Sequence, residues 1–325
     1  MNRRSEARLP AVELPAGGGL LLVDKPSGCT SHDVVGWVRG LLGTRRVGHA
    51  GTLDPMATGL LVIAVNRSTK LLGHLALTDK TYLATIRLGV ATSTDDAEGA
   101  PTRTADASGV SDDAIAGGLL ALTGELMQVP SAVSAIKVGG RRSYERVRAG
   151  EAVELAARPV TVPRFELLGE PRRGGPVVDL DVAVDCSTGT YIRALARDLG
   201  EGLGVGGHLT ALRRTKVGPF EIAGAVDVYG AAGVPERGVE RAPIPDELRA
   251  AVAGSLIPAA AAARLAFRVR TATDDEALDL SYGRSLAEVG IDGSYAVLDS
   301  SGTHLLALVA EGDGKAKPRL VFDAR

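Results

Sequence analysis

The segment GHAGTLDPMATG, residues 48–59, places a single acid, Asp54, among closely spaced glycines and directly before Pro55. Glycine tolerates positive φ angles and lets a ligand approach the backbone, whereas proline stiffens the turn that follows the acid. The next six residues, LLVIAV, predict a short buried strand that holds the segment on a rigid element. An isolated Asp-Pro usually forms an ordinary turn in which the aspartate bonds nearby backbone. The length of this segment and its density of glycine favour instead a site that seats something flat against the backbone.

The composition is that of a soluble globular protein, with 45% hydrophobic and 23% charged residues. The 325 residues suffice for one large domain and a small one, because single cores stop growing at roughly 250–300 residues. Residues 1–15 lack the apolar core of a signal peptide, and no apolar run approaches the roughly 20 residues of a membrane span. Two cysteines, Cys29 and Cys186, cannot form a disulfide framework or a cysteine-based zinc site. We therefore expect a cytoplasmic protein that binds no metal.

The net charge of −2 is unusual for a protein that binds RNA, but the charges are unevenly distributed. Residues 137–173 contain nine Lys or Arg against five Asp or Glu, and residues 193–216 contain five against two. The offsetting acids collect in residues 95–98, in residues 112–113 and beyond residue 242. Any single one of these charges is equally typical of an ordinary solvated surface. Together they are compatible with basic faces that bind RNA.

The periodicity of the apolar residues predicts a mixed sheet flanked by helices, an α+β fold. Ser31 is a candidate N-cap for a helix with an apolar stripe from Val34 to Leu42, and Ser111 is a candidate N-cap for a second helix. Further elements are expected at residues 20–23, 81–88 and 178–184 (strands) and at residues 190–203 (helix). The β and α segments do not alternate with the spacing of a parallel sheet, which favours the α+β class.

The last third of the chain has a different composition. Residues 230–263 are rich in Gly, Pro and Ala and predict a linker with one short helix. Short strands with polar turns are expected after it, at residues 265–269, 295–298, 305–309 and 319–322. About sixty residues of short strands are typical of a small β-barrel. We therefore expect two domains, residues 1–253 and residues 254–325.

Four motifs resemble one known family. GHAGTLDPMATG is similar to the signature loop of the bacterial tRNA pseudouridine synthases that modify uridine 55 of the T loop, the TruB family. LLLVDKPSGCTSHDVV (residues 20–35), Lys80-Thr81-Tyr82 and CSTGTYIRALARDLG (residues 186–200) resemble its other motifs in the correct order. The resemblance extends over roughly the first 220 residues and implies the pseudouridine synthase fold, with a central sheet that is largely antiparallel. Residues 254–325 resemble the RNA-binding PUA module of many relatives only loosely.

The resemblance implies an isomerisation that needs no cofactor, because no redox step occurs when the glycosidic bond is broken and the base is rejoined through C5. Asp54 is the implied catalytic carboxylate, by attack on the base, attack on the sugar or removal of a proton from the sugar. Burial alone would raise the pKa of Asp54, and the motif supplies Arg193 as the opposing cation. Tyr82 lies on the apolar face of its strand, which by itself favours a core residue. The resemblance implies instead that Tyr82 stacks on the uracil ring.

The resemblance also implies a set of substrate contacts. Tyr191 and Leu212 match residues that line the base pocket, and His49 matches the residue that fills the place of the flipped base. Lys25 is expected to support the active-site loop, although an ordinary solvated turn residue is the alternative. Residues 131–152 resemble an RNA-contacting insertion, in which Arg141 and Arg142 are expected to contact phosphates. The expected partner is the T arm of tRNA, bound by a monomer with no obligate protein partner and no membrane.

Two other function classes fit parts of the sequence. A nucleobase deaminase would need zinc ligands in an H-x-E and P-C-x-x-C arrangement, and the sequence has neither. A non-catalytic tRNA-binding protein would have no reason to retain Asp54, Tyr82 and Arg193 together. Synthases that work through a guide RNA share the core motifs, but the length and the short amino terminus favour the stand-alone bacterial form.

Overall fold

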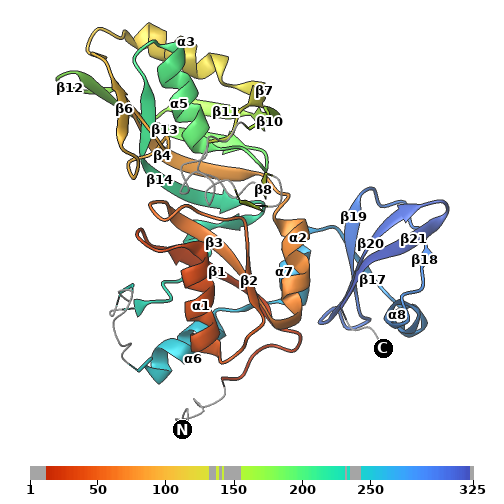
Figure 1. The fold of residues 1–325 in the computed structure, drawn as a ribbon. Helices are drawn as coiled ribbons and strands as arrows, with labels where there is room; N and C mark the ends of the chain where they lie inside the picture. The colour runs from red at the N-terminus through yellow and green to blue at the C-terminus, as the bar shows by residue number, and fades with distance from the viewer. Residues whose placement is uncertain are drawn as a thin grey trace. The chain divides into compact units, whose positions relative to one another are not determined.

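The computed structural model describes residues 12–131, 155–230, 233–234 and 243–322, together with the backbone of residues 137–138 and 141–142. The chain forms two compact units, and neither is continuous in sequence (Figure 1). Unit 1 contains residues 1–54, 60–76 and 218–325, and unit 2 contains residues 55–59 and 77–217. The predicted domain boundary after residue 253 stays a prediction.

Unit 1 is built on β1 (Gly19–Lys25) and β3 (Thr58–Val65). β1 pairs antiparallel with the short β16 (Ile257–Pro258), and β3 pairs antiparallel with β2 (Val47–Ala50). Almost every residue of β1 and β3 is buried, which is why both read as continuous apolar runs rather than as alternating strands. The strand predicted after the GHAGTLDPMATG segment is confirmed, and it begins two residues earlier than expected.

Helix α1 (Ser31–Leu42) provides the core of unit 1 with its apolar stripe. Each buried Val or Leu on that stripe stabilises the fold by about 1.5–3 kcal/mol. The predicted N-cap is wrong by one residue, because Thr30 caps the helix in a reciprocal capping box with Asp33. Ser31 is instead buried inside the first turn. Trp37, the single tryptophan, donates its Nε1 hydrogen to the carbonyl of Val228, 2.6 Å away.

Unit 2 contains the strand order β11-β13-β4-β14, and the first two residues of β3 join it beside β14. These strands span Arg164–Leu167 (β11), Val177–Cys186 (β13), Lys80–Leu88 (β4) and Gly207–Val217 (β14). The β11, β13, β4 and β14 pairs are antiparallel, whereas β14 and β3 are parallel. The predicted mixed, largely antiparallel sheet is therefore confirmed. Buried residues alternate along β4 as its sequence pattern predicts.

Helix α5 (Ile192–Gly202) packs on β14, and α3 (Asp112–Ala121) begins at the predicted N-cap Ser111 (Figure 1). Smaller elements of unit 2 are β5 (Val90–Thr92), β6 (Pro101–Thr104), β7 (Gly124–Gln128), β10 (Arg158–Val162) and β12 (Arg172–Gly174). β8 (Lys137–Val138) and β9 (Arg141–Arg142) pair as a short antiparallel ladder. β7 pairs with β10 outside the main sheet. This pair carries one residue that the sequence did not single out, Gln128.

The carboxyl-terminal part of unit 1 differs from the prediction at its start. Residues 243–266 hold two helices, α6 (Asp246–Gly254) and α7 (Ala259–Ala266), and the expected strand at residues 265–269 is wrong because α7 continues to Ala266. A five-stranded sheet follows, in the order β17-β19-β20-β21-β18. Its strands are β17 (Val269–Thr271), β18 (Leu286–Ala287), β19 (Ser294–Leu298), β20 (Leu305–Gly312) and β21 (Lys315–Val321), with α8 (Asp274–Ser281) after β17. The small β-rich carboxyl-terminal module is confirmed, with its own buried core.

Candidate active site

The loop that carries Asp54 is fastened at the preceding residue. The Ser31 hydroxyl donates to the Leu53 carbonyl at 3.2 Å and lies 2.9 Å from the Leu53 amide nitrogen, which donates back to it. Ser31 and Leu53 are both buried, so this two-way contact is shielded from water. Gly51 has a φ of +84°, a conformation that other residues adopt with strain. The backbone on the amino side of the half-buried Asp54 is therefore well defined by local contacts.

Gly59 is the last residue of the GHAGTLDPMATG segment, and the backbone of β14 approaches it closely. Its φ is +98°, and a Cβ atom at this position would lie 2.8 Å from the Arg214 backbone nitrogen and still closer to the Arg214 carbonyl. Only a residue without a side chain fits there. The prediction of permissive backbone is confirmed for Gly51 and Gly59. Gly48, by contrast, lies in strand β2, where its missing side chain leaves room for Leu72.

Lys25 supports the chain just before α1. Its side chain is completely buried, and Nζ donates to the carbonyls of Pro26 and Cys29 at 2.9 and 2.7 Å. The alternative of a solvated turn residue is therefore wrong. A buried ammonium that ties together the turn preceding α1 is consistent with the expected supporting role.

His49 is on strand β2 rather than on the loop, opposite Ile63 of β3. Its ring meets the ring of His32 edge-on, with the two centroids 5.4 Å apart. His32 comes from α1, in the SGCTSHDVV segment, and the sequence did not single it out. This edge-on contact with His32 orients the His49 ring within unit 1, whereas its role toward RNA stays a prediction.

Tyr82 and Leu212 lie on one face of the sheet in unit 2. Leu212 of β14 is opposite Ala84 of β4, and Arg214 is opposite Tyr82. Cross-strand partners share a face, and Tyr82 and Ala84 are two residues apart on β4. Tyr82, Leu212 and Arg214 are 7%, 8% and 1% exposed. The sheet thus brings two predicted pocket residues together and adds a buried arginine beside them.

Lys80 increases the positive charge of this face. It begins β4 and is buried, with Nζ donating to the Thr78 carbonyl at 2.6 Å. Burial, and then the nearby charge of Arg214, lower the pKa of Lys80 from its ordinary value. Two buried cations on the face of Tyr82 suit a site that receives an anionic or strongly polar ligand.

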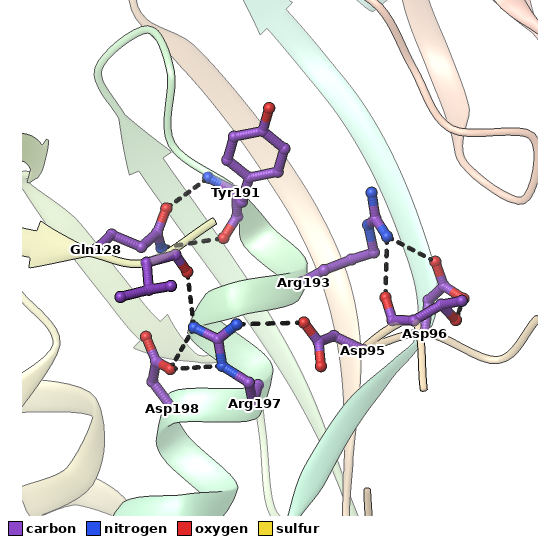
Figure 2. Close-up of polar contacts among 9 residues, drawn as sticks. Asp95, Asp96, Gln128, Tyr191, Arg193, Arg197 and Asp198 are labelled. Carbon is purple, nitrogen blue, oxygen red and sulfur yellow. Dashed lines mark hydrogen bonds and ion pairs between the residues drawn. The ribbon is translucent and has the colours of Figure 1, made fainter. Parts of the chain in front are cut away.

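Arg193 is buried in the first turn of α5 and faces a tight loop (Figure 2). Its Nη1 donates to the Thr94 carbonyl at 2.9 Å and lies 3.4 Å from an Asp96 carboxylate oxygen. Both side chains of this ion pair are 4% exposed. From the charge pattern alone, the acids in residues 95–98 are expected only to offset the basic residues elsewhere in the chain. Asp96 is instead the buried partner that holds the predicted catalytic arginine.

Arg197, one turn further along α5, binds the same loop and a second element (Figure 2). Its Nη1 lies 3.4 Å from Asp95, and its Nη2 donates to the Val129 carbonyl at 2.7 Å. Residues four apart share a helix face, which is why Arg193 and Arg197 meet the neighbouring acids Asp96 and Asp95. A third acid, Asp198, bonds the Arg197 guanidinium at 2.7 Å. Burial raises the pKa of Asp198, and this guanidinium opposes that rise.

Tyr191 is the N-cap residue of α5, and its main chain is held by a side chain from β7. Gln128 Nε2 donates to the Tyr191 carbonyl at 3.1 Å, and the Tyr191 amide donates to Gln128 Oε1 at 2.8 Å. The Tyr191 side chain extends away from this carboxamide (Figure 2). Unit 2 therefore contains Tyr82, Tyr191, Arg193 and Leu212, and unit 1 contains Lys25, His49 and Asp54.

The basic surface predicted from residues 137–173 is partly neutralised by acids elsewhere in the chain. Aspartates of β13 pair with arginines of the adjacent strands: Arg87 with Asp179, Arg164 with Asp185, and Arg172 with Asp181. Hydrogen bonds from these arginines hold the pKa of each aspartate below its ordinary value. Arg173 likewise pairs with Asp112. Counting charges in a sequence window missed these pairs because the acids lie outside it.

The side chains of Arg141 and Arg142 lie outside the described part of the structure, as does most of the predicted insertion at residues 131–152. Among the described residues, no helix is long and apolar enough to cross a membrane. The same residues contain no group of three or more His, Cys, Asp or Glu side chains placed to hold a metal ion.

Sequence comparisons place these residues in a known family. Residues 39–192 match the TruB family pseudouridylate synthase N-terminal domain, and residues 193–229 and 267–323 match two tRNA pseudouridine synthase carboxyl-terminal domains. A protein of Rhodococcus jostii named tRNA pseudouridine synthase B is 55% identical over 94% of this chain and 94% of its own length. This chain belongs to the TruB family of pseudouridylate synthases. A relative with the same name from Nocardia farcinica is 53% identical over 98% of both sequences.

Solved structures agree with the TruB family at the level of the fold. A Cbf5-Nop10-Gar1 complex contains a chain with a TM-score of 0.67 and 24% identity, covering 97% of this chain and 91% of that one. The archaeal box H/ACA Nop10-Cbf5 complex gives a TM-score of 0.64 and 23% identity, covering 94% and 86%. The predictions of a pseudouridine synthase fold and of a pseudouridine synthase enzyme are confirmed. The roles of the individual site residues stay predictions.

Proposed function

We propose that this enzyme isomerises uridine 55 in the T loop of tRNA to pseudouridine. The observation that carries the proposal is the 53–55% identity, over nearly the full length, to proteins named tRNA pseudouridine synthase B. The intact GHAGTLDPMATG loop supports it. The substrate is the T arm, and the enzyme acts on it as a monomer without an obligate protein partner. Because its substrate is cytoplasmic tRNA, the enzyme works in the bacterial cytoplasm.

The reaction begins at the Asp54 carboxylate. Uridine is unstacked from the T loop, and His49 fills the place it leaves, which offsets part of the few kcal/mol that unstacking costs. The ionised carboxylate then opens the reaction at the base or at the sugar, and the glycosidic bond breaks. The detached uracil turns so that C5 faces C1′, and the new carbon–carbon bond forms. The C5 proton then leaves to solvent, N1 takes up a proton in its place, and Asp54 is released as the free carboxylate. Atoms and electrons balance without an oxidant, a reductant or a cofactor.

The remaining residues seat the base while it turns. Tyr82 stacks on the uracil ring, and Tyr191 and Leu212 line the pocket on the face that the sheet already forms from Tyr82 and Leu212. Arg193 supplies the positive charge that keeps a carboxylate ionised away from water. Its anchorage by Asp96 and Thr94 in a buried environment supports this assignment, because the guanidinium is held in one orientation before substrate arrives.

Tritium release from 5-tritiated uridine tests the assignment of substrate. A T-arm hairpin is expected to release tritium to water in proportion to pseudouridine formed. An anticodon-arm hairpin of the same length, with its own loop uridines, is expected to release none. Equal release from both hairpins would contradict T-arm recognition.

Arg141 and Arg142 are expected to contribute affinity rather than chemistry. Replacing both by alanine should weaken binding to every RNA tested and flatten the slope of log affinity against log salt by about one to two units. The single-turnover rate at saturating RNA should fall far less than the affinity. Binding titrations at several salt concentrations measure the slope.

The matched control is the adjacent arginine pair Arg172 and Arg173, changed to alanine together. Each of these arginines is already paired with an aspartate, Asp181 or Asp112, so their loss should leave the salt slope unchanged. An unchanged slope in the Arg141/Arg142 double variant would show that the insertion does not contact phosphates.

A further inference from the structure

Gln128 is the only glutamine in the sequence, and it is 3% exposed at the end of β7. Its carboxamide takes both main-chain polar groups of one residue, Tyr191, although 63 positions separate the two in sequence. A carboxamide suits this task because it carries a donor and an acceptor side by side. The arrangement repeats the two-way pairing of a β-ladder, but it is made by a side chain with a residue that belongs to no strand.

The position held by Gln128 is the starting point of α5. Tyr191 has an extended backbone, and its own side chain makes no capping hydrogen bond to the helix. The Tyr191 carbonyl also accepts the first intrahelical bond, from the Leu195 amide at 3.2 Å. The carboxamide therefore fixes the peptide groups on both sides of the Tyr191 Cα atom. The direction of the Tyr191 side chain follows from the orientation of these two peptide groups. Arg193 lies two residues further along, in the first turn of the same helix (Figure 2).

The support behind Gln128 is itself well anchored. β7 pairs with β10, where Arg158 is opposite Gln128. The next residue, Val129, is held through its carbonyl by Arg197 of α5. Gln128, the last residue of β7, and Val129 directly after it thus bind the N-cap residue of α5 and Arg197 within α5. A side chain whose own backbone is held in place by such contacts can set the geometry of another residue.

We propose that Gln128 is a positioning residue for uridine isomerisation, acting through the main chain of Tyr191 to set the base pocket. The inference rests on the proposed function, because it is there that Tyr191 lines the pocket. Gln128 touches neither the substrate nor the reacting atoms. Its loss should slow the reaction of bound RNA and leave the affinity for RNA nearly unchanged.

Two substitutions separate positioning from mere packing. Gln128→Met keeps a long side chain and removes both hydrogen bonds, so the Tyr191 amide loses this acceptor and the Tyr191 carbonyl keeps only the bond from the Leu195 amide. Gln128→Glu keeps the acceptor for the Tyr191 amide, but an ionised carboxylate cannot donate to the Tyr191 carbonyl. A protonated carboxyl can do both, because its hydroxyl replaces the amide donor. The charged groups on the supporting elements are Glu125 on β7, Arg158 on β10, and Arg193, Arg197, Asp198 and Glu201 on α5.

The experiment measures the single-turnover rate at saturating T-arm hairpin, the dissociation constant and the unfolding temperature for each purified full-length variant. Gln128→Met is expected to react about tenfold or more slowly than the wild type, at every pH, since a lost buried hydrogen bond of ordinary strength has that effect on a rate. Gln128→Glu is expected to be slow at pH 8 and to recover relative to the wild type as the pH falls toward 6. The exposed neighbour Met127 provides the control, because Met127→Glu adds the same charge without reaching Tyr191.

Either of two results overturns the inference. In the first, folded Gln128→Met and Gln128→Glu react at the wild-type rate and show only a lower unfolding temperature. In the second, the rate of Gln128→Glu relative to the wild type does not change with pH, or Met127→Glu changes in the same way. If Gln128→Met fails to fold, the pH profile of Gln128→Glu decides alone. Failure of the wild type to isomerise the hairpin would contradict the proposed function instead, so the two failures are distinguishable.

Discussion

The Asp54→Asn variant is expected to bind T-arm RNA within a few fold of the wild type and to form no measurable pseudouridine. Asparagine has the shape of aspartate but carries no negative charge and is a poor nucleophile or base. A catalytic carboxylate is needed in the rate-determining chemistry, so its loss should cost at least about a thousandfold in single-turnover rate. The backbone of the loop should persist, because the Ser31 contact to Leu53 does not involve Asp54.

Tritium release from 5-tritiated uridine and a binding titration together measure this result. Asp106→Asn is the matched control, since Asp106 is an exposed acid that only caps a surface turn through Ser108. The control should keep wild-type turnover. Turnover of Asp54→Asn within tenfold of the wild type would remove Asp54 from the catalytic role.

The second large effect is expected at Arg193. Replacing it by methionine leaves the Asp96 carboxylate buried without its ion pair, which should lower the free energy of unfolding by about 3–5 kcal/mol. It also removes the cation assigned to the catalytic carboxylate, so the single-turnover rate should fall by about two to three orders of magnitude. Arg193→Lys should recover part of the stability, because one ammonium can still donate to Asp96 and Thr94. It should recover little of the rate, because lysine lacks the planar fork with which a guanidinium holds a further carboxylate.

The double variant Arg193→Met/Asp96→Asn separates the two effects. Removing both buried charges should restore most of the free energy of unfolding, since no uncompensated carboxylate is left. The isomerisation rate should stay as low as in Arg193→Met. Chemical denaturation and single-turnover assays on the same preparations measure both quantities. A double variant that regains wild-type turnover would show that Arg193 serves stability alone.

The central elements could be predicted because their patterns are local. The alternation along β4 and the apolar run after Gly59 each follow from a period set by the backbone itself, and the structure confirms both. The glycine conformations at Gly51 and Gly59 follow equally from residue type. Residue type alone does not separate Thr30 from Ser31 as the N-cap of α1, because threonine and serine are both good caps. The capping box with Asp33 favours Thr30.

The partners of the site residues could not be predicted, because they are distant in sequence. Asp96 is 97 positions from Arg193 in the sequence. Two neighbouring aspartates in a polar turn do not indicate that either side chain is buried. Gln128 ends β7, a short strand that the sequence pattern does not predict. The role proposed for Gln128 follows only from its contact with Tyr191. The Ala-rich residues 259–266 fit a linker as well as a helix by composition. Packing decides in favour of the helix, because four of its alanines are buried.

The most direct test of the proposed function is to map pseudouridine by mass spectrometry in a full tRNA transcript treated with the purified protein. We expect a single new pseudouridine, at uridine 55, in the wild-type reaction and none in the Asp54→Asn reaction. Pseudouridine at another position with uridine 55 unmodified, or formation that survives the loss of the Asp54 carboxylate, would contradict it.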